Sequence, residues 1–257
     1  MSAAPEVLGG RRVVAAALVG CLTLAPAAAN AAPPWIKRAF VGRGGEPNRA
    51  TAAPPVARYL IDDGGVFILD RTAPRPLLKF DDSPEVWVLS AARGPRGDMI
   101  YSNDMGEPLL RTTRLGGATV FTTRRPEGSA AAMAGASSPL RLISLGPVGL
   151  YQRLLQASVR SSRAAGRLIG FNAPNADPAS DGLIADTAVI ASEAVVTLAS
   201  RAGGKALLSR VAEIDIAQGP QPGAYLRAGV VNITVAPAQG LAGRPSSVKI
   251  LQAVGTR

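Results

Sequence analysis

Short apolar segments separated by turn residues fill residues 57–123, and this spacing restricts the fold more than any other feature of the chain. A new segment begins about every ten residues, as in an antiparallel meander, a small sandwich or a barrel. Asp62-Asp63-Gly64-Gly65 joins the first two as a hairpin, because glycine accepts the positive φ of a tight turn. The expected strands are Ala57–Ile61, Val66–Asp70, Leu77–Phe80, Val86–Ala91, Met99–Tyr101, Leu109–Thr113 and Ala118–Thr122.

The second half of the chain mixes helix and strand patterns. Pro147 begins a helix that reaches about Ala165, and Asp181 caps a second helix from Leu183 to about Ser200. Residues 124–138 lose periodicity and become rich in glycine, alanine and serine, so we expect a flexible connection and a candidate domain boundary there. Further strands are expected at Leu168–Phe171, Arg210–Ala217, Tyr225–Val235 and Val248–Val254.

Together these patterns predict an α+β fold. Its N-terminal half is an antiparallel β-rich meander, small sandwich or barrel, and its second half holds two helices and several strands. The second helix is apolar almost all round, but Asp186 and Glu193 within it argue against a membrane span and favour a buried helix.

The first helix is amphipathic. One side carries Val148, Tyr151, Leu155 and Val159 at helical spacing, and the opposite side carries Arg153, Arg160, Arg163 and Arg167. We interpret the apolar side as the side that faces the core. The arginines then form either a solvated face or a contact for anionic lipid or an acidic cell-wall polymer.

The first 31 residues read as a bacterial-type signal peptide. Arg11 and Arg12 precede the apolar stretch Val13–Leu24, which is too short to span a bilayer. Because Ala29-Asn30-Ala31 supplies the small residues of a cleavage site, we expect export to the periplasm with cleavage after Ala31. The alternative is a lipid anchor at Cys21, since Leu18-Val19-Gly20-Cys21 has the form of a lipobox.

The rest of the chain divides into an arm and a domain. Residues 32–56 are rich in proline, arginine and glycine and are interpreted as a basic arm. Residues 57–257 are expected to form a single α+β domain.

The chain contains no histidine, and its one cysteine is Cys21. The mature chain therefore has no disulfide, imidazole base, thiolate nucleophile or ordinary zinc ligand set. These absences exclude Ser-His-Asp and Cys-His catalysis. We expect no cofactor and no bound metal.

The formal net charge is +10, from 28 basic and 18 acidic residues. A basic balance of this size favours acidic partners, namely anionic lipid or an acidic cell-wall polymer. We expect no nucleic-acid partner, because an exported protein is separated from cellular nucleic acid. An aromatic content of 4% also provides few side chains on which bases could stack.

Catalysis without histidine or cysteine falls to carboxylates or to a Ser-Lys pair. A carboxylate pair could cleave a glycosidic bond or bind calcium, but these acids lie where turns need them. Ser246-Ser247-Val248-Lys249 matches the S-x-x-K pattern of penicillin-recognising enzymes, without the other motifs of that class, so we interpret it as chance. The acids gather at Asp62/Asp63, Asp81/Asp82/Glu85 and Asp98/Asp104/Glu107.

Several stretches resemble a known family. They are Val66-Phe67-Ile68-Leu69-Asp70-Arg71, Arg96-Gly97-Asp98 with Asn103-Asp104 and Gly106-Glu107-Pro108, Arg114-Leu115-Gly116-Gly117, and Gly240-Leu241-Ala242-Gly243-Arg244-Pro245-Ser246-Ser247. Together they resemble a family of uncharacterised exported proteins of alphaproteobacteria, a domain-of-unknown-function family. The resemblance covers most of the mature chain and implies no activity.

These observations lead to one expectation and one alternative. We expect an exported periplasmic or cell-envelope protein with a non-catalytic binding or structural role. The alternative is a carboxylate-dependent hydrolase that acts on cell-wall glycans.

Overall fold

The computed structural model describes residues 53–255. The predicted signal segment, the Cys21 alternative and the predicted arm up to residue 52 lie outside the described residues. The arm's remaining residues lead directly into the first strand, which begins at Val56.

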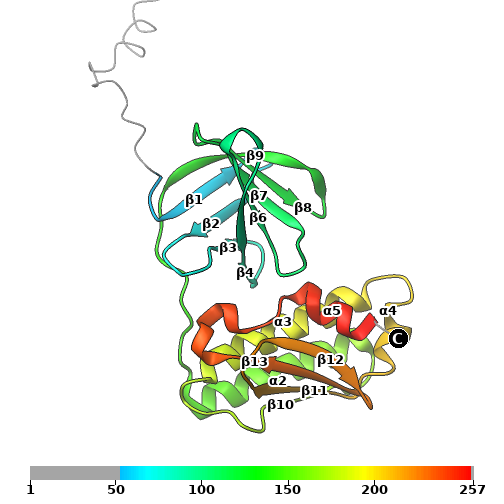
Figure 1. Ribbon diagram of the computed structural model, residues 1–257. Coiled ribbons are helices and arrows are strands. Elements are labelled where there is room, and N and C mark those ends of the chain that lie inside the picture. Colours follow the sequence, from blue (N-terminus) through cyan, green and yellow to red (C-terminus); the bar gives the residue numbers. More distant parts are fainter. Residues whose placement is uncertain (1–52, 256–257) are drawn as a thin grey trace, which may run out of the picture. The chain divides into compact units, whose positions relative to one another are not determined.

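The first half is one antiparallel sheet of nine strands, in the spatial order β4-β3-β2-β1-β9-β8-β7-β6-β5 (Figure 1). A short 3₁₀ turn, Pro95–Gly97, separates β5 from β6. The strands are β1 Val56–Ile61, β2 Val66–Asp70, β3 Leu77–Phe80, β4 Val86–Val88, β5 Ser90–Arg93, β6 Met99–Ser102, β7 Pro108–Thr112, β8 Ala118–Thr122 and β9 Arg125–Ala136.

The predicted strand Val86–Ala91 is divided, and the division nearly closes the sheet. β4 and β5 lie at opposite edges, yet Leu89 is the single residue between them. The two edges must therefore approach one another. The Leu89 side chain is completely buried, and its N–H donates to Pro76 O at 2.8 Å, so the crossing point is anchored inside the fold.

Alternating apolar side chains fill the interior of this sheet. In β1, Ala57, Tyr59 and Ile61 are buried while Arg58 and Leu60 point outward, the period of two that a strand imposes. The predicted hairpin between β1 and β2 is confirmed, with Gly64 at φ +92°. The buried residues are Ala57, Tyr59, Ile61, Phe67, Leu69, Leu78, Leu89, Tyr101, Leu110, Ala118 and Val120.

The flexible connection predicted at residues 124–138 is wrong. Residues 125–136 form β9, which pairs with β1 on one side and β8 on the other. Its small residues have weak strand propensity, so pairing with the neighbouring strands β1 and β8, more than the propensity of its own residues, makes this segment a strand. Small side chains are also required locally: a Cβ on Gly128 would lie 2.6 Å from the Thr119 side chain.

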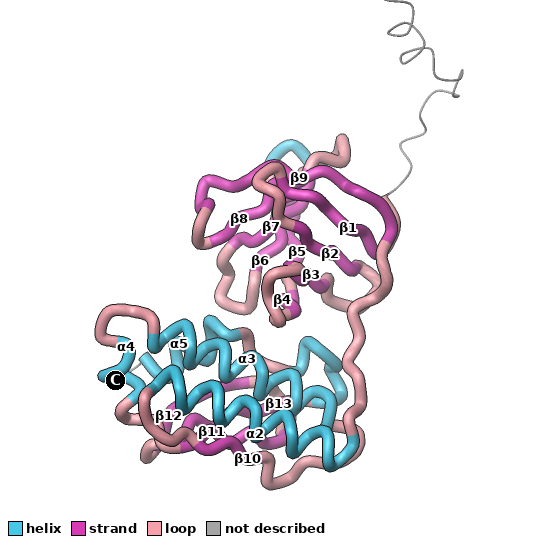
Figure 2. The backbone as a smooth tube through the Cα atoms, turned by 180° about the vertical axis from the view of Figure 1, so that it is seen from behind, coloured by secondary structure: helices cyan, strands magenta, loops and turns pink. Residues whose placement is uncertain are grey.

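The second half is a four-stranded sheet with helices over one face. Its strand order is β10-β11-β13-β12, in which β12 is antiparallel to β13 and the other neighbours are parallel. The helices lie behind the strands in Figure 1 and in front of them in Figure 2. The elements are α2 Gly146–Ala165, β10 Gly170–Asn172, α3 Asp181–Ala199, α4 Gly204–Leu208, β11 Glu213–Gln218, β12 Gly223–Arg227, β13 Val230–Val235, the 3₁₀ segment η2 Pro237–Gly243 and α5 Ser247–Gly255.

Two of the predicted strands here are wrong. The single strand Tyr225–Val235 is a hairpin, β12 and β13, turned at Ala228-Gly229, where both residues have positive φ. The strand Val248–Val254 is the helix α5. Its buried residues Ile250 and Val254 are four apart, which is the spacing of one helix face.

α3 is the central helix of this half. Most of its residues are buried, and Ile184, Ala188, Ile190 and Ala191 are completely inaccessible. Within residues 53–255, α3 is the one helix long and apolar enough to cross a membrane, but the same composition belongs to a core helix, and most of this one is buried inside the fold. The expected α+β class is confirmed.

Candidate functional site

A buried arginine joins the two halves. Arg244 is 5% exposed, and its Nη2 donates to Val86 O of β4 at 2.8 Å. Its Nε binds the carboxylate of Asp186 in α3, and its Nη1 lies 3.9 Å from Glu85 Oε1. The preceding Gly243 packs tightly against the backbone of Ala236, where a Cβ on Gly243 would lie 1.9 Å from Ala236 O.

Two carboxylates from the first half bind the start of α5. Ser247 N donates to Glu85 Oε1 at 2.9 Å, and Ser247 Oγ donates to Glu85 Oε2 at 2.6 Å. Ser246 N donates to Asp104 Oδ2 at 3.1 Å. Burial raises the pKa of Glu85, although the Ser247 hydrogen bonds and the Arg244 charge oppose that rise. These acids therefore satisfy the free amides of a helix N-terminus.

A small polar pocket of about 110 Å³ lies beside this junction. Ser246 and Lys249 of the S-x-x-K stretch both line it, but Ser246 Oγ accepts a hydrogen bond from Lys249 N at 3.2 Å. That is the bond of an N-cap residue, which explains a serine at this position without catalysis. Arg75, Trp87 and Asp104 also line this pocket.

Four of the six remaining predicted acids support turns or ion pairs, and the other two, Asp62 and Asp82, are exposed. Asp63 accepts from Gly65 N at 3.1 Å, and Glu107 accepts from the Asn103 side chain at 2.8 Å. Asp81 pairs with Arg58 at 3.2 Å, and Asp98 with Arg111. Among the described residues, no three or more His, Cys, Asp or Glu side chains gather where they could hold a metal ion.

The four arginines singled out in the sequence lie on or just after α2, and all four are exposed. Arg160 pairs with Glu193 of α3 at 2.5 Å, and Arg167 donates to Ser209 O. Arg153 lies 3.4 Å from the Gln156 side chain. Arg163 lines an open groove beside α3.

The side of α2 expected to face the core is exposed, so that prediction is wrong. Leu150, Ala157 and Ser161 are the buried residues, and α2 packs through them against α3. Small residues let the two helix backbones approach closely, which leaves no room for the larger apolar side chains. Those side chains remain in solvent: Val148 is 72% exposed, Tyr151 67%, Leu155 51% and Val159 41%. We call these four residues the apolar stripe.

A groove of about 700 Å³ runs open to solvent beside the stripe. Leu155, Val159 and Val196 contribute apolar surface to it, and Arg160 and Arg163 contribute cationic side chains. The exposed surface of α2 thus combines apolar and basic side chains in adjacent positions, so the expectation that they lie on opposite sides of the helix is wrong. The sequence contained a signal for this orientation, because Ala157, Ser161 and Ala165 are small and recur every four residues.

The family described as Domain of unknown function (DUF4908) matches residues 37–254, which is most of the chain. The chain belongs to the DUF4908 family. Membership confirms the expected resemblance to a domain-of-unknown-function family, while the alphaproteobacterial source and export stay predictions. No curated protein and no solved structure matches this DUF4908 chain.

Proposed function

We propose that this DUF4908 chain is an exported cell-envelope protein with a non-catalytic role, and that it binds an anionic surface through the exposed face of α2. The exposure of that face carries the proposal. A folded domain rarely leaves a row of large apolar side chains in water unless a partner covers them.

Charge supports an anionic partner. α2 contains Arg153, Arg160 and Arg163 and no acidic residue, and the whole chain carries +10. Glu193 of α3 is the acid that pairs with this face, and it neutralises only Arg160. Each basic side chain near an anionic surface contributes about 1 kcal/mol of attraction.

The acids give no support to the glycan-hydrolase alternative. Such an enzyme needs two carboxylates facing a substrate across a gap. Glu85 and Asp104 instead accept hydrogen bonds from the adjacent amides of Ser247 and Ser246 at the start of α5, and Asp98 and Asp81 pair with arginines. These contacts give each of the four carboxylates a structural role.

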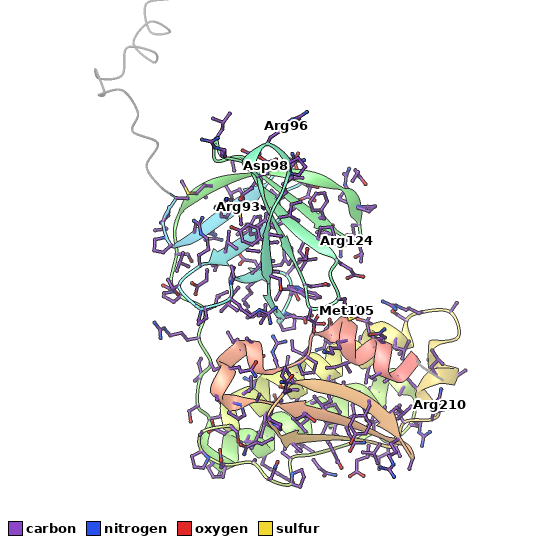
Figure 3. The ribbon with its side chains drawn as sticks, in the orientation of Figure 1. Arg93, Arg96, Asp98, Met105, Arg124 and Arg210 are labelled. Carbon is purple, nitrogen blue, oxygen red and sulfur yellow. The ribbon has the colours of Figure 1, made fainter. Side chains whose placement is uncertain are left out.

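The test is co-sedimentation of the mature protein with wall sacculi and with anionic vesicles. The variant R153Q/R160Q/R163Q removes three charges from α2, and R93Q/R124Q/R210Q removes three from exposed sites elsewhere (Figure 3). Arg167 is kept, because it binds Ser209 O.

We expect the α2 variant to bind about a hundredfold more weakly at low salt, from about 1 kcal/mol per arginine. The control variant should bind as the parent does, and added salt should weaken the parent. Equal weakening in both variants would mean that net charge alone attracts the protein, and no weakening in either would reject the proposal.

A further inference from the structure

The apolar stripe runs along α2 from Val148 near its start to Val159, six residues before its end. Val148, Tyr151, Leu155 and Val159 follow one another at steps of three and four residues, so they form a single row on the helix surface. Two further apolar side chains are exposed in the segments that flank the helix, Ile143 at 75% and Leu168 at 78%. Within the described residues, nothing covers this row.

The basic side chains border the row on one side. At 100° per residue, Arg163 lies about 40° around the helix from Val159, and Arg160 and Arg153 lie farther round in the same direction. The buried side of α2, Leu150 to Ser161, lies opposite. The exposed surface therefore has an apolar half and a basic half, which is the pattern of a helix that lies in a membrane interface.

We propose that the occupant of this face is an anionic lipid bilayer. α2 lies parallel to the membrane plane, the apolar stripe enters the boundary between headgroups and acyl chains, and the arginines contact lipid phosphates. This proposal rests on the proposed function and names its partner. Tyr151 suits such a boundary, because its ring is apolar and its hydroxyl is polar.

Charge and hydrophobicity together select this occupant. A second copy of the chain would bring Arg153 and Arg163 against like charges, and residues 32–52 are basic as well, with Lys37, Arg38, Arg43 and Arg49 outnumbering Glu46. A wall polymer would pair with the arginines but leave the stripe in water. A bilayer with anionic headgroups matches both halves of the face.

The first experiment separates lipid from wall polymer. The variant Y151S/L155S changes two stripe residues that are more than half exposed, so folding should be unaffected. We expect its binding to anionic vesicles to fall about tenfold or more, because each buried methylene strengthens insertion. Its binding to sacculi should match the parent's. Unchanged vesicle binding in Y151S/L155S, alongside weak binding in R153Q/R160Q/R163Q, would overturn the lipid proposal and leave the proposed function standing.

The second experiment measures insertion directly. Tryptophan is placed at Tyr151, and in a control protein at Tyr225, which is exposed to a similar degree on β12. With vesicles that contain brominated lipid, the Tyr151→Trp protein should show added quenching relative to the parent, and the Tyr225→Trp protein should not. Equal quenching in the two proteins would overturn the proposed orientation. So would a dimer in sedimentation velocity that Y151S/L155S converts to a monomer.

Discussion

At the scale of single residues, the most consequential side chain is Arg244. Removing one partner of a buried ionic group leaves the others charged and unpaired, which costs far more than the net gain from the pair. Besides the neighbouring Pro245 O, Arg244 has partners from two parts of the fold: the Asp186 carboxylate, the Glu85 carboxylate and Val86 O. Its guanidinium therefore ties α3, β4 and the segment before α5 together.

We expect Arg244→Met to lower the free energy of unfolding by about 3–5 kcal/mol. Urea titration followed by circular dichroism measures this change. Arg93→Met, at an exposed site, is the control and should stay within about 0.5 kcal/mol of the parent. Equal unfolding midpoints for the two variants would contradict the role assigned to Arg244.

Asp181 gives a second prediction at this scale, in the dependence of stability on pH. Burial alone would raise the pKa of Asp181, but hydrogen bonds from Ser144, Gly146, Leu145 and Gly182 outweigh it and lower the pKa. A carboxylate with a lowered pKa stabilises the fold at pH values above its unfolded-state pKa, which is about 3.9 for aspartate. This stabilisation is lost as the pH falls through the pKa of the folded state. The parent should therefore exceed Asp181→Asn in stability at pH 6, and this advantage should shrink steadily below about pH 4.

Glu85 should show the opposite dependence of stability on pH and serves as the control. Its pKa is raised, chiefly by burial, so its contribution is present below the unfolded-state value of about 4.3 and declines as pH rises through the native value. The stability of Glu85→Gln relative to the parent should therefore increase as the pH is raised from about 4 to about 7. Urea titrations at several pH values measure both trends, and parallel curves for the two variants would contradict the assignment.

At the scale of elements, α2 shows what a periodic pattern determines and what it leaves open. Its bounds follow from Pro147 at the start and Gly166 at the end, and both were readable from the sequence. Its orientation was ambiguous, because the sequence offers two packing faces, the apolar row and the row of small residues. α3 decides between them, since its largely apolar surface accepts the small side chains at close range.

The same contact gives a prediction about packing. Ala157 is 4% exposed where α2 meets α3, so Ala157→Leu should force the helices apart and destabilise the fold by about 1–3 kcal/mol. Gln156→Leu places the same side chain one residue away on the exposed face and should change stability by less than about 0.5 kcal/mol. Thermal or urea unfolding of both variants measures the difference. A destabilisation by Gln156→Leu as large as that by Ala157→Leu would mean that the exposed face is packed.

β9 and α5 were missed for a related reason. Residues 125–136 lack strand formers, and only their neighbours β1 and β8 make them extended. Val248–Val254 is rich in residues that suit strands, yet the amides at its start are held by Ser246, Glu85 and Asp104. In both segments, contacts distant in sequence override the local propensity. Apart from the break at Leu89, which divides β4 from β5, the strands of residues 56–122 were predictable, because their alternation and their turns are local.

At the scale of the whole molecule, the two halves are joined by contacts that no sequence pattern predicts. Val86 and Leu77 of the first half share a small apolar cluster with Leu241 of the second. The Arg244 contacts lie next to that cluster in sequence and join residues 158 positions apart. Of the candidate site, the arginines of α2 were predictable, whereas the exposure of the apolar stripe required the fold.

Export is the prediction that belongs to this scale. The positive residues, apolar stretch and small-residue site at the N-terminus predict a mature chain that begins at or near Ala32. N-terminal sequencing of protein from the periplasmic fraction measures it. Full-length protein in the cytoplasm would contradict export, and a lipid on Cys21 would replace release with anchoring.

The near closure of the nine-stranded sheet has a consequence for contact between molecules. An open sheet edge presents unpaired amides and carbonyls on which a foreign chain can add a strand. Here the two edges are short, with three residues in β4 and four in β5, and Leu89 ties them to each other. Little edge therefore remains on this sheet for another chain to extend, so the first half of the protein offers few places at which neighbouring copies could begin intermolecular β-structure.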